Sequence, residues 1–172
     1  MPMPRLPIVM APDRVLKTKC APVADVDGAV RRLMDDMLET MYDAPGLGLA
    51  APQVGVSRRV FVVDVAREGE PPAPMVFANP EIVAVSDERV VMNEGCLSLP
   101  EIYVDVERPE AITVTYLDRD GEERRIDADG MLARCMLHEI DHLDGILHVD
   151  YLSTLRRSII LRKLAKQRKG AA

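Results

Sequence analysis

The feature that most constrains this chain is an apolar helix pattern with two histidines near its centre. Between residues 129 and 145, in DGMLARCMLHEIDHLDG, apolar side chains recur at helical spacing over roughly four turns. Asp127 or Asp129 can cap the start of this helix, and Gly145 lies where a helix would end. Polar groups on so apolar a helix need partners, so the rest of the chain must pack around it and supply them.

The helix carries His138 and His142 in an H-E-x-x-H pattern, with Glu139 beside them. Residues four apart lie on one face of a helix, so the two imidazoles can bind a single metal ion. Glu139 is close enough to act on a water at that metal but is badly placed to be a ligand. A chance match is the alternative, but two of the chain's three histidines have the required spacing. The pattern favours a metal site.

Two histidines do not complete such a site, which usually has three protein ligands and an open position. Cys135 lies on the same helix face, but a rise of about 1.5 Å per residue places it roughly 10 Å from His142 along the axis. One metal with bonds of about 2 Å could hardly bind both. His148 would face the other side of a continued helix. Cys96, next to Gly95, is the remaining candidate, with a small buried hydrophobic role as the alternative.

The composition is that of one globular domain, which we expect to span residues 1–172. Hydrophobic residues make up 48% of the chain and charged residues 29%, unlike a disordered or a membrane protein. The start lacks the apolar run of a secretory signal, and no segment approaches transmembrane length. The three cysteines are widely spaced and make no disulfide framework. These features predict a cytoplasmic protein without a membrane partner.

Further helices and short strands follow from the apolar periodicity. Residues 25–42 have the pattern of an amphipathic surface helix. Segments rich in β-branched residues predict strands at 60–65, 75–79, 81–85, 89–92, 102–106, 111–117 and 122–126. Because strands precede the long helix, we expect an α+β fold. Its short, mostly antiparallel sheets pack around the central metal-binding helix, with an N-terminal and a C-terminal helix.

Residues 46–55, GLGLAAPQVG, form a segment of small side chains. A G-x-G-x-x-A pattern indicates a dinucleotide site only where it joins a strand to the helix that it opens. Here it follows a helix and runs through Pro52 toward a strand, so we reject that interpretation. A structural turn and a loop whose backbone approaches a ligand closely remain as alternatives. Gln53 is the uncharged hydrogen-bonding side chain of this segment.

Residues 153–169 predict a basic helix. This segment has seven positive residues and no acidic one, although the whole chain has a net charge of −6. A solvated helix face is the simple explanation. A surface that faces nucleic-acid phosphate is the other.

Three segments together resemble the peptide deformylases, enzymes that remove the formyl group from the N-terminal methionine of new bacterial proteins. They are G-x-G-x-A-A-x-Q at 46–53, E-G-C-L-S at 94–98 and H-E-x-D-H at 138–142. They occur in the family's order and at compatible spacing, and the similarity extends to Leu152. The resemblance implies a metal-dependent hydrolase that acts on N-formylmethionyl nascent peptides and releases formate.

The resemblance also assigns the metal ligands and the catalytic base. Cys96, His138 and His142 would hold one divalent metal ion, Fe2+ in the cell, with Zn2+, Ni2+ or Co2+ also accepted. Glu139 would be the general base that takes a proton from the attacking water, and the acid that returns it to the departing amine.

Other family roles fall on residues around this centre. Gln53 and the backbone N–H of Leu97 would stabilise the negative oxygen of the tetrahedral intermediate. Leu47, Gly48 and Gly95 would bind the substrate, with the Gly48 carbonyl accepting a hydrogen bond from the formamide N–H or from the substrate backbone. These assignments are implied by the resemblance alone.

Glu94 resembles a carboxylate that pairs with an arginine, for which Arg108 is the candidate, and would support the ligands from behind. Arg134 departs from the pattern, because the family commonly has an apolar residue there in the methionine side-chain pocket. Tyr103 occupies a variable position at the pocket edge. These departures concern substrate preference and leave the catalytic assignment intact.

Partners and rival functions complete the expectations. We expect a monomer, with the basic helix at 153–169 near the exit tunnel of the ribosome. A zinc endopeptidase shares H-E-x-x-H, but it normally draws its third ligand from a downstream His or Glu, and little chain remains here. A closed structural metal site or an inactive ribosome-binding module would have no need of Glu139.

Overall fold

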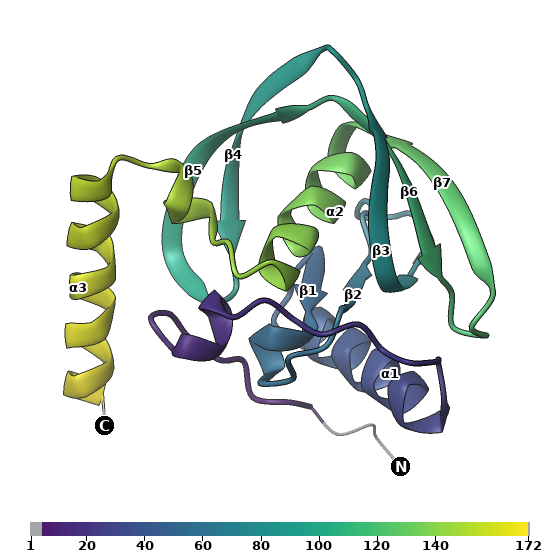
Figure 1. The fold of residues 1–172 in the computed structure, drawn as a ribbon. Coiled ribbons are helices and arrows are strands. Elements are labelled where there is room, and N and C mark those ends of the chain that lie inside the picture. The colour runs from purple at the N-terminus through teal and green to yellow at the C-terminus, as the bar shows by residue number, and fades with distance from the viewer. Residues whose placement is uncertain (1–4, 172) are drawn as a thin grey trace.

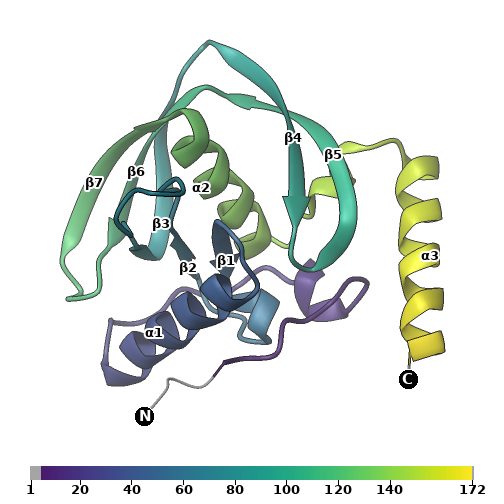
Figure 2. The same ribbon diagram turned by 180° about the vertical axis from the view of Figure 1, so that it is seen from behind.

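Helix α2 (Gly130–Leu143) lies between two antiparallel sheets in the computed structural model, which describes residues 5–171 (Figure 1). The larger sheet has the strand order β1-β2-β3-β6-β7, and β4 pairs with β5 in a separate two-stranded sheet. The view from behind shows the two sheets on opposite sides of α2 (Figure 2). The predicted α+β architecture is confirmed, and its central helix is the one that carries H-E-x-x-H.

The strands agree with the predicted positions better than with the predicted lengths. The larger sheet contains β1 (Gly48–Ala50), β2 (Val60–Val63), β3 (Met75–Val85), β6 (Ala111–Leu117) and β7 (Glu123–Asp129). The smaller contains β4 (Arg89–Cys96) and β5 (Leu99–Pro109). Two predicted strands are in fact one, because β3 continues through Asn79 with a φ of 49° and register shifts on either side of Glu81. Bulges of this kind let a strand bend and keep its pairing.

The short strand β1 is absent from the sequence-based prediction. Its three residues pair with β2, with Gly48 opposite Val63 and Ala50 opposite Phe61. A segment this short has no periodicity to detect, so its strand character comes from the partner rather than from its own sequence. A 3-10 turn, η2 (Ala51–Val54), follows directly. The glycine-rich segment therefore forms the edge of the larger sheet next to α2.

Helices α1 (Gly28–Asp43) and α3 (Thr154–Ala171) flank this core at the two ends of the chain. The side chain of Asp27 caps α1 by accepting from the Val30 N–H at 2.9 Å. Methionines on one face of α1 are fully buried against the larger sheet. Helix α3 stands at the edge of the molecule (Figure 1), where Leu164 is its buried residue. Among residues 5–171, every helix is too short or too polar to span a lipid bilayer.

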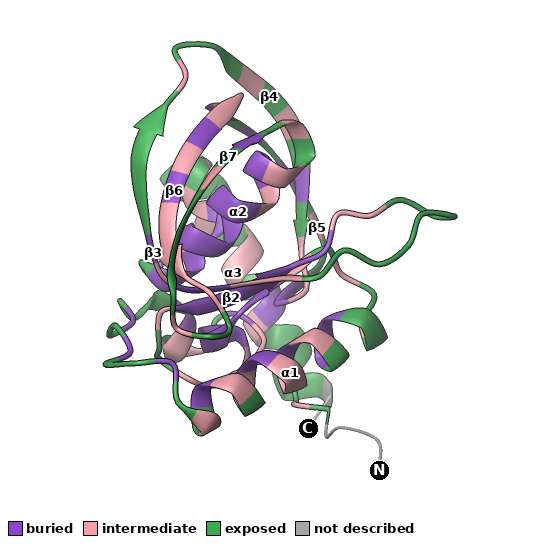
Figure 3. Ribbon diagram, turned by 90° about the vertical axis from the view of Figure 1, so that its right-hand side faces the viewer, coloured by how far each residue is buried: buried purple, intermediate pink, exposed green. Residues whose placement is uncertain are grey.

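Helix α2 ends where the sequence indicates, and contacts from distant segments fix that end. Gly145 has a φ of +75°, and a Cβ there would lie 2.7 Å from the carbonyl oxygen of Lys17. Arg59 Nη1 donates to the Leu143 carbonyl at 3.0 Å and to Asp144 at 2.9 Å. Figure 3 shows the buried residues concentrated on α2 and on the strands that face it. The histidines therefore lie on a rigid, buried element.

Candidate metal centre

Three side chains that the sequence singles out meet at one point. One ligand atom from each of Cys96, His138 and His142 lies within 4.8 Å of the others. Cys96 Sγ lies 3.3 Å from His142 Nε2. The histidines come from α2 and the cysteine from the end of β4, so the centre joins the helix to the smaller sheet. A thiolate and two imidazoles form a donor set that suits zinc or iron.

The orientation of His138 is set by a carboxylate behind it. His138 Nδ1 lies 2.9 Å from Glu94 Oε1, and Arg108 binds the same carboxylate through Nε at 2.6 Å and Nη2 at 2.9 Å. Burial alone would raise the pKa of Glu94, but the hydrogen bonds from Arg108 and His138 hold it well below its usual range. A carboxylate can only accept, so Nδ1 donates to Glu94, which leaves Nε2 as the nitrogen that could bind a metal.

A wider polar network, which sequence reasoning missed, surrounds Glu94. Arg134 Nη1 donates to Glu94 Oε2 at 2.7 Å. On the other side, Arg108 Nη1 and the Tyr151 hydroxyl both donate to Asp141 Oδ2, at 2.8 Å and 2.6 Å. One sequence signal could have found the first contact, since Arg134 is four residues before His138 and therefore on the same helix face. The guanidinium of Arg134 is bound within this network, so its charge is compensated there.

Glu139 is buried beside the three ligands and has an unsatisfied oxygen. Its Oε1 atom has no hydrogen-bond partner among the described residues, and burial raises the pKa of its carboxyl to about 7, against the opposing charge of His138. A Cβ on Gly48 would lie 2.7 Å from Glu139 Oε2, so only glycine leaves room for this carboxylate. A buried carboxyl that titrates near neutrality is suited to proton transfer.

The side chain of Gln53 is held with its amide nitrogen toward the centre. Its Oε1 atom accepts from the Ala50 N–H at 2.9 Å. Its Nε2 donates to Ser98 Oγ at 3.1 Å and lies 3.7 Å from Cys96 Sγ. Leu97 lies between β4 and β5, directly after the cysteine. Donors near the ligands can stabilise a negative oxygen that develops there.

The remaining histidine and cysteine near α2 lie outside the ligand group. His148 is buried, with Nε2 donating to the Ile102 carbonyl at 3.0 Å and its ring centroid 5.9 Å from that of His138. It reaches this position because the chain turns at Gly145, and not by continuing α2. Burial raises the pKa of the Cys135 thiol to about 12. This protonated thiol lacks the thiolate character of a metal ligand.

A cavity of about 750 Å³ opens beside two of the candidate ligands, Cys96 and His138. Leu47, Gly48, Gly95 and Tyr103 line it, together with Glu139. A Cβ on Gly95 would lie 2.9 Å from the ring of Tyr103, so the aromatic side chain lies directly over that backbone. The residues predicted to bind substrate therefore share one cavity with the candidate base.

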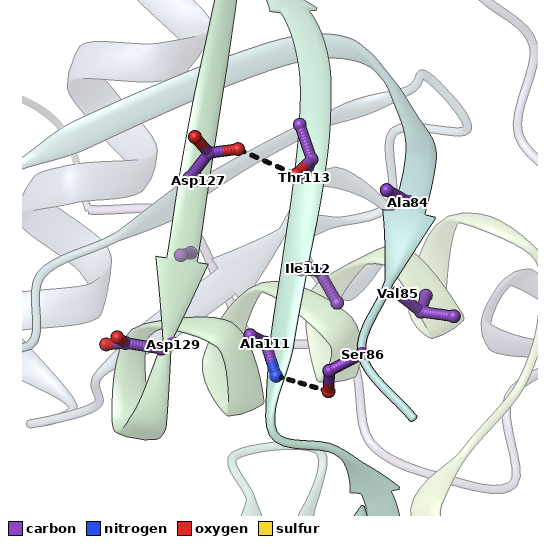
Figure 4. A pocket seen from close by; sticks show the side chains of 9 residues that line it. Ala84, Val85, Ser86, Ala111, Ile112, Thr113, Asp127 and Asp129 are labelled. Carbon is purple, nitrogen blue, oxygen red and sulfur yellow. Dashed lines mark hydrogen bonds between the residues drawn. The ribbon is translucent and has the colours of Figure 1, made fainter. Parts of the chain in front are cut away.

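A second, smaller hollow of about 360 Å³ lies on the larger sheet (Figure 4). There Thr113 Oγ1 donates to Asp127 at 2.7 Å and the Ala111 N–H donates to Ser86 Oγ at 3.0 Å. None of the predicted site residues lines it. It contains none of the histidine and cysteine side chains that could hold a metal, so the larger cavity is the candidate reactive centre.

Comparisons with known proteins agree with this geometry. Residues 5–158 match the family model described as polypeptide deformylase. The peptide deformylase of Rhizobium meliloti (strain 1021) is 54% identical over 163 residues, which cover 95% of this chain and 94% of the relative. That of Agrobacterium fabrum (strain C58) is also 54% identical, over 93% of this chain and 94% of the relative.

Solved structures give the same result. A crystal structure of peptide deformylase from Ehrlichia chaffeensis has a TM-score of 0.92 at 42% identity, covering 98% of this chain and 99% of that one. A second structure from the same organism, in complex with actinonin, has a TM-score of 0.91 at 45% identity and covers 96% and 98% of the two chains.

Proposed function

The chain belongs to the polypeptide deformylase family, and on that premise we propose roles for the residues of its metal centre. The protein is a hydrolase that removes the N-formyl group from newly made peptides, and it depends on a metal. We assign Cys96, His138 and His142 as the ligands. The observation that supports a hydrolytic rather than a purely structural metal site is the buried carboxylate of Glu139, whose Oε1 has no hydrogen-bond partner within residues 5–171, beside that cluster.

The chain's own residues account for binding and proton transfer. A divalent metal at this centre supplies Lewis-acid activation of water and of the formyl carbonyl. Glu139 takes the proton of the attacking water and later delivers it to the departing amine. The amide of Gln53 and the N–H of Leu97 stabilise the developing negative oxygen, at roughly 3 kcal/mol for each donor.

The substrate is held along the glycine-containing edges of the cavity. Leu47 and Gly48 on one side and Gly95 on the other bind the peptide backbone, and Glu94 with Arg108 holds His138 in place from behind. Gly48 serves two purposes, because its missing side chain also makes room for Glu139. We further propose that residues 1–172 act as one catalytic domain, with the basic helix at 153–169 attached to it.

Formate release from a formyl-methionyl peptide tests the function directly. Purified protein, kept anaerobic, should release formate from the formyl peptide and leave the acetyl-methionyl peptide intact, because the extra methyl needs room beside the metal. The Glu139→Ala variant should lose roughly 10²–10⁴-fold in rate and keep its metal. Near-normal turnover in this variant, or loss of its metal, contradicts the role of Glu139.

We propose Fe2+ as the metal in the cell, with Zn2+, Ni2+ or Co2+ able to replace it. Cys96 is only partly buried, so a thiolate on a redox-active ion is exposed to oxidation. The iron-loaded enzyme should therefore lose activity in air, and the nickel-loaded enzyme should not. Metal analysis of protein purified anaerobically from cells, combined with the two decay rates, decides the identity. Equal decay rates would contradict the predicted air sensitivity of the iron form.

We propose that α3 carries the enzyme to the ribosome in the cytoplasm, as a monomer. The helix contains no acidic residue, and its positive residues are Arg156, Arg157, Arg162, Lys163, Lys166, Arg168 and Lys169. Leu164 is buried against the body of the protein, so truncation would also remove packing. Neutral substitutions at exposed positions are the cleaner test.

A variant with Arg162, Lys163, Lys166 and Lys169 changed to glutamine should bind ribosomes more weakly, with a smaller dependence on salt. Its turnover of short formyl peptides should not change. Co-sedimentation at two salt concentrations measures the first effect, and sedimentation of the free enzyme measures the oligomeric state. Equal pelleting of variant and wild type means that α3 is an ordinary solvated helix.

A further inference from the structure

Arg134 connects the metal-binding helix to both strands of the smaller sheet by hydrogen bonds from a single side chain. It lies on α2, is 5% exposed, and donates to the Glu94 carboxylate at 2.7 Å. It also donates to the carbonyl of Val106 on β5 and to that of Val90 on β4, both at 2.6 Å. The guanidinium thus bridges the metal-binding helix to both strands of the smaller sheet.

This bridge matters because the metal ligands come from the two parts that it joins. His138 and His142 are on α2, and Cys96 is at the end of β4. The β4–β5 sheet shares no strand pairing with the larger sheet within residues 5–171, so side-chain contacts with the helix contribute to its position relative to α2. Three hydrogen bonds from one rigid, planar group fix that position well.

Arg134 also fixes the carboxylate that orients His138. Glu94 Oε2 accepts hydrogen bonds from Arg134 Nη1 and Arg108 Nε. The other oxygen, Oε1, accepts from Arg108 Nη2 and His138 Nδ1. With two donors on Oε2, the carboxylate cannot rotate without breaking a buried charged hydrogen bond. Each such bond contributes more than a neutral one, and the loss of one partner in a buried site is costly.

We propose that Arg134 is a positioning residue for the metal centre. By holding Glu94 and both strands of the β4–β5 sheet, it sets the separation between the histidine ligands on α2 and the thiolate of Cys96. It thereby determines how slowly the metal leaves. This inference rests on the proposed ligand set but not on the reaction, and metal release measures it without any substrate.

The test compares Arg134→Met, Arg134→Lys and a control, Arg124→Met. Arg124 is a surface arginine that pairs with Asp118 and Glu122 in the β6–β7 turn. Zinc-loaded proteins are mixed with an excess of a coloured chelator, and the rate of zinc release is followed. Loss of a supporting contact behind a metal ligand typically weakens metal binding by about 10–100-fold, so Arg134→Met should release zinc faster by a factor of that order.

The lysine variant should fall between wild type and Arg134→Met. Its ammonium can reach Glu94, but it cannot also hold the two carbonyls in a fixed plane. The control should release zinc at the wild-type rate. In cobalt-loaded protein, the visible absorption bands should shift in Arg134→Met and stay unchanged in the control, because they report ligand geometry.

Two results overturn the proposal. One is that zinc release and the cobalt spectrum of Arg134→Met match the wild type while only its resistance to denaturant falls, which describes a purely structural residue. The other applies if Arg134→Met does not fold: the lysine variant then decides, and wild-type release from it contradicts the proposal. A wild-type protein that holds zinc but releases no formate contradicts the proposed function and leaves this comparison valid.

Discussion

At the scale of single residues, the tightest steric contact in the site is between Gly48 and the proposed base, Glu139. Any side chain on Gly48 would overlap Glu139, since a Cβ would lie 2.7 Å from Oε2 and 3.1 Å from Cγ. The carboxylate must then move or the strand must shift. Misplacement of a catalytic group by about 1 Å can cost roughly 100-fold in rate. Gly48 therefore has a steric role besides the backbone role that the resemblance implies.

The Gly48→Ala variant should lose about 10–100-fold in kcat/KM for a formyl-methionyl peptide and keep its bound metal. Steady-state kinetics and metal analysis of the same preparation measure both effects. Gly28→Ala is the control, because a Cβ there would lie no closer than 3.4 Å to Arg32 at the start of α1. Wild-type kinetics in Gly48→Ala would show that the base can move aside without cost.

At the scale of elements, the end of α2 depends on glycine for two separate reasons. Gly145 has a left-handed backbone and also lies against the Lys17 carbonyl. Gly130, at the start of the same helix, has a φ of +56°, and a Cβ there would have no neighbouring atom within 4 Å. A side chain at Gly130 would therefore meet only an unfavourable backbone conformation, whereas one at Gly145 would also meet a steric overlap.

The Gly145→Ala variant should lower the free energy of unfolding by about 2 kcal/mol or more, since strain and overlap both act. Gly130→Ala should cost about 1–2 kcal/mol, because only the backbone conformation is disfavoured. Denaturant unfolding of the metal-free proteins measures both. A larger loss in Gly130→Ala than in Gly145→Ala contradicts the steric argument.

The loop after β2 is held by a single carboxylate whose effect depends on pH. Asp64 accepts from the Tyr42 hydroxyl at 2.6 Å and from the N–H groups of Ala66 and Ala73 at 2.9 and 3.1 Å. Burial alone would raise the pKa of Asp64, but these hydrogen bonds lower it below its ordinary value of 3.8. The ionised form therefore stabilises the folded state.

Because the folded pKa is the lower one, this stabilisation is complete above the ordinary carboxyl pKa and is lost as pH falls through the folded value. The Asp64→Asn variant should be less stable than wild type at neutral pH, and the difference should shrink below about pH 4. Denaturant unfolding across this pH range measures it, with Asp120→Asn at the exposed β6–β7 turn as the control. A constant difference would exclude ionisation as the cause.

The long helices can be predicted from the sequence, whereas elements whose structure depends on pairing with distant residues cannot. Helix α2 and its ligands follow from periodicity and spacing within one segment, and so does α1. Strand β1 and the full length of β4 and β5 follow from pairing with distant residues, which a local pattern does not contain. Arg134 lines the larger cavity, as the sequence indicates, but nothing local shows that its guanidinium also bonds to the carbonyls of Val90 and Val106.

At the scale of the whole molecule, the proposed metal centre adds one more link between the central helix and the smaller sheet. Two of the proposed ligands are on the central helix and one is on the smaller sheet, so an ion bound there would link them. An ion that binds only the folded state stabilises it by about 2.7 kcal/mol at 100 times its Kd. We therefore expect the proposed centre to stabilise the fold in addition to its role in the reaction.

Removal of the metal should lower the Tm by roughly 5–10 °C, since 1 kcal/mol corresponds to about 2–4 °C in a domain of this size. Thermal melts with zinc and after chelation measure the shift. Cys96→Ser should lose most of it, whereas Cys135→Ser, which changes a cysteine outside the ligand group, should retain it. The same shift in both serine variants would contradict the assignment of Cys96.

The positions of the proposed ligands along the chain determine when, during synthesis, the metal centre can form. Translation delivers the N-terminal part first. The proposed centre needs Cys96, both histidines of α2 and the turn at Gly145, where the end of the helix contacts Lys17. The last ligand therefore leaves the ribosome only after most of the chain has been synthesised. A growing copy therefore lacks the proposed centre until late in its synthesis, and we expect it to have no deformylase activity before that point.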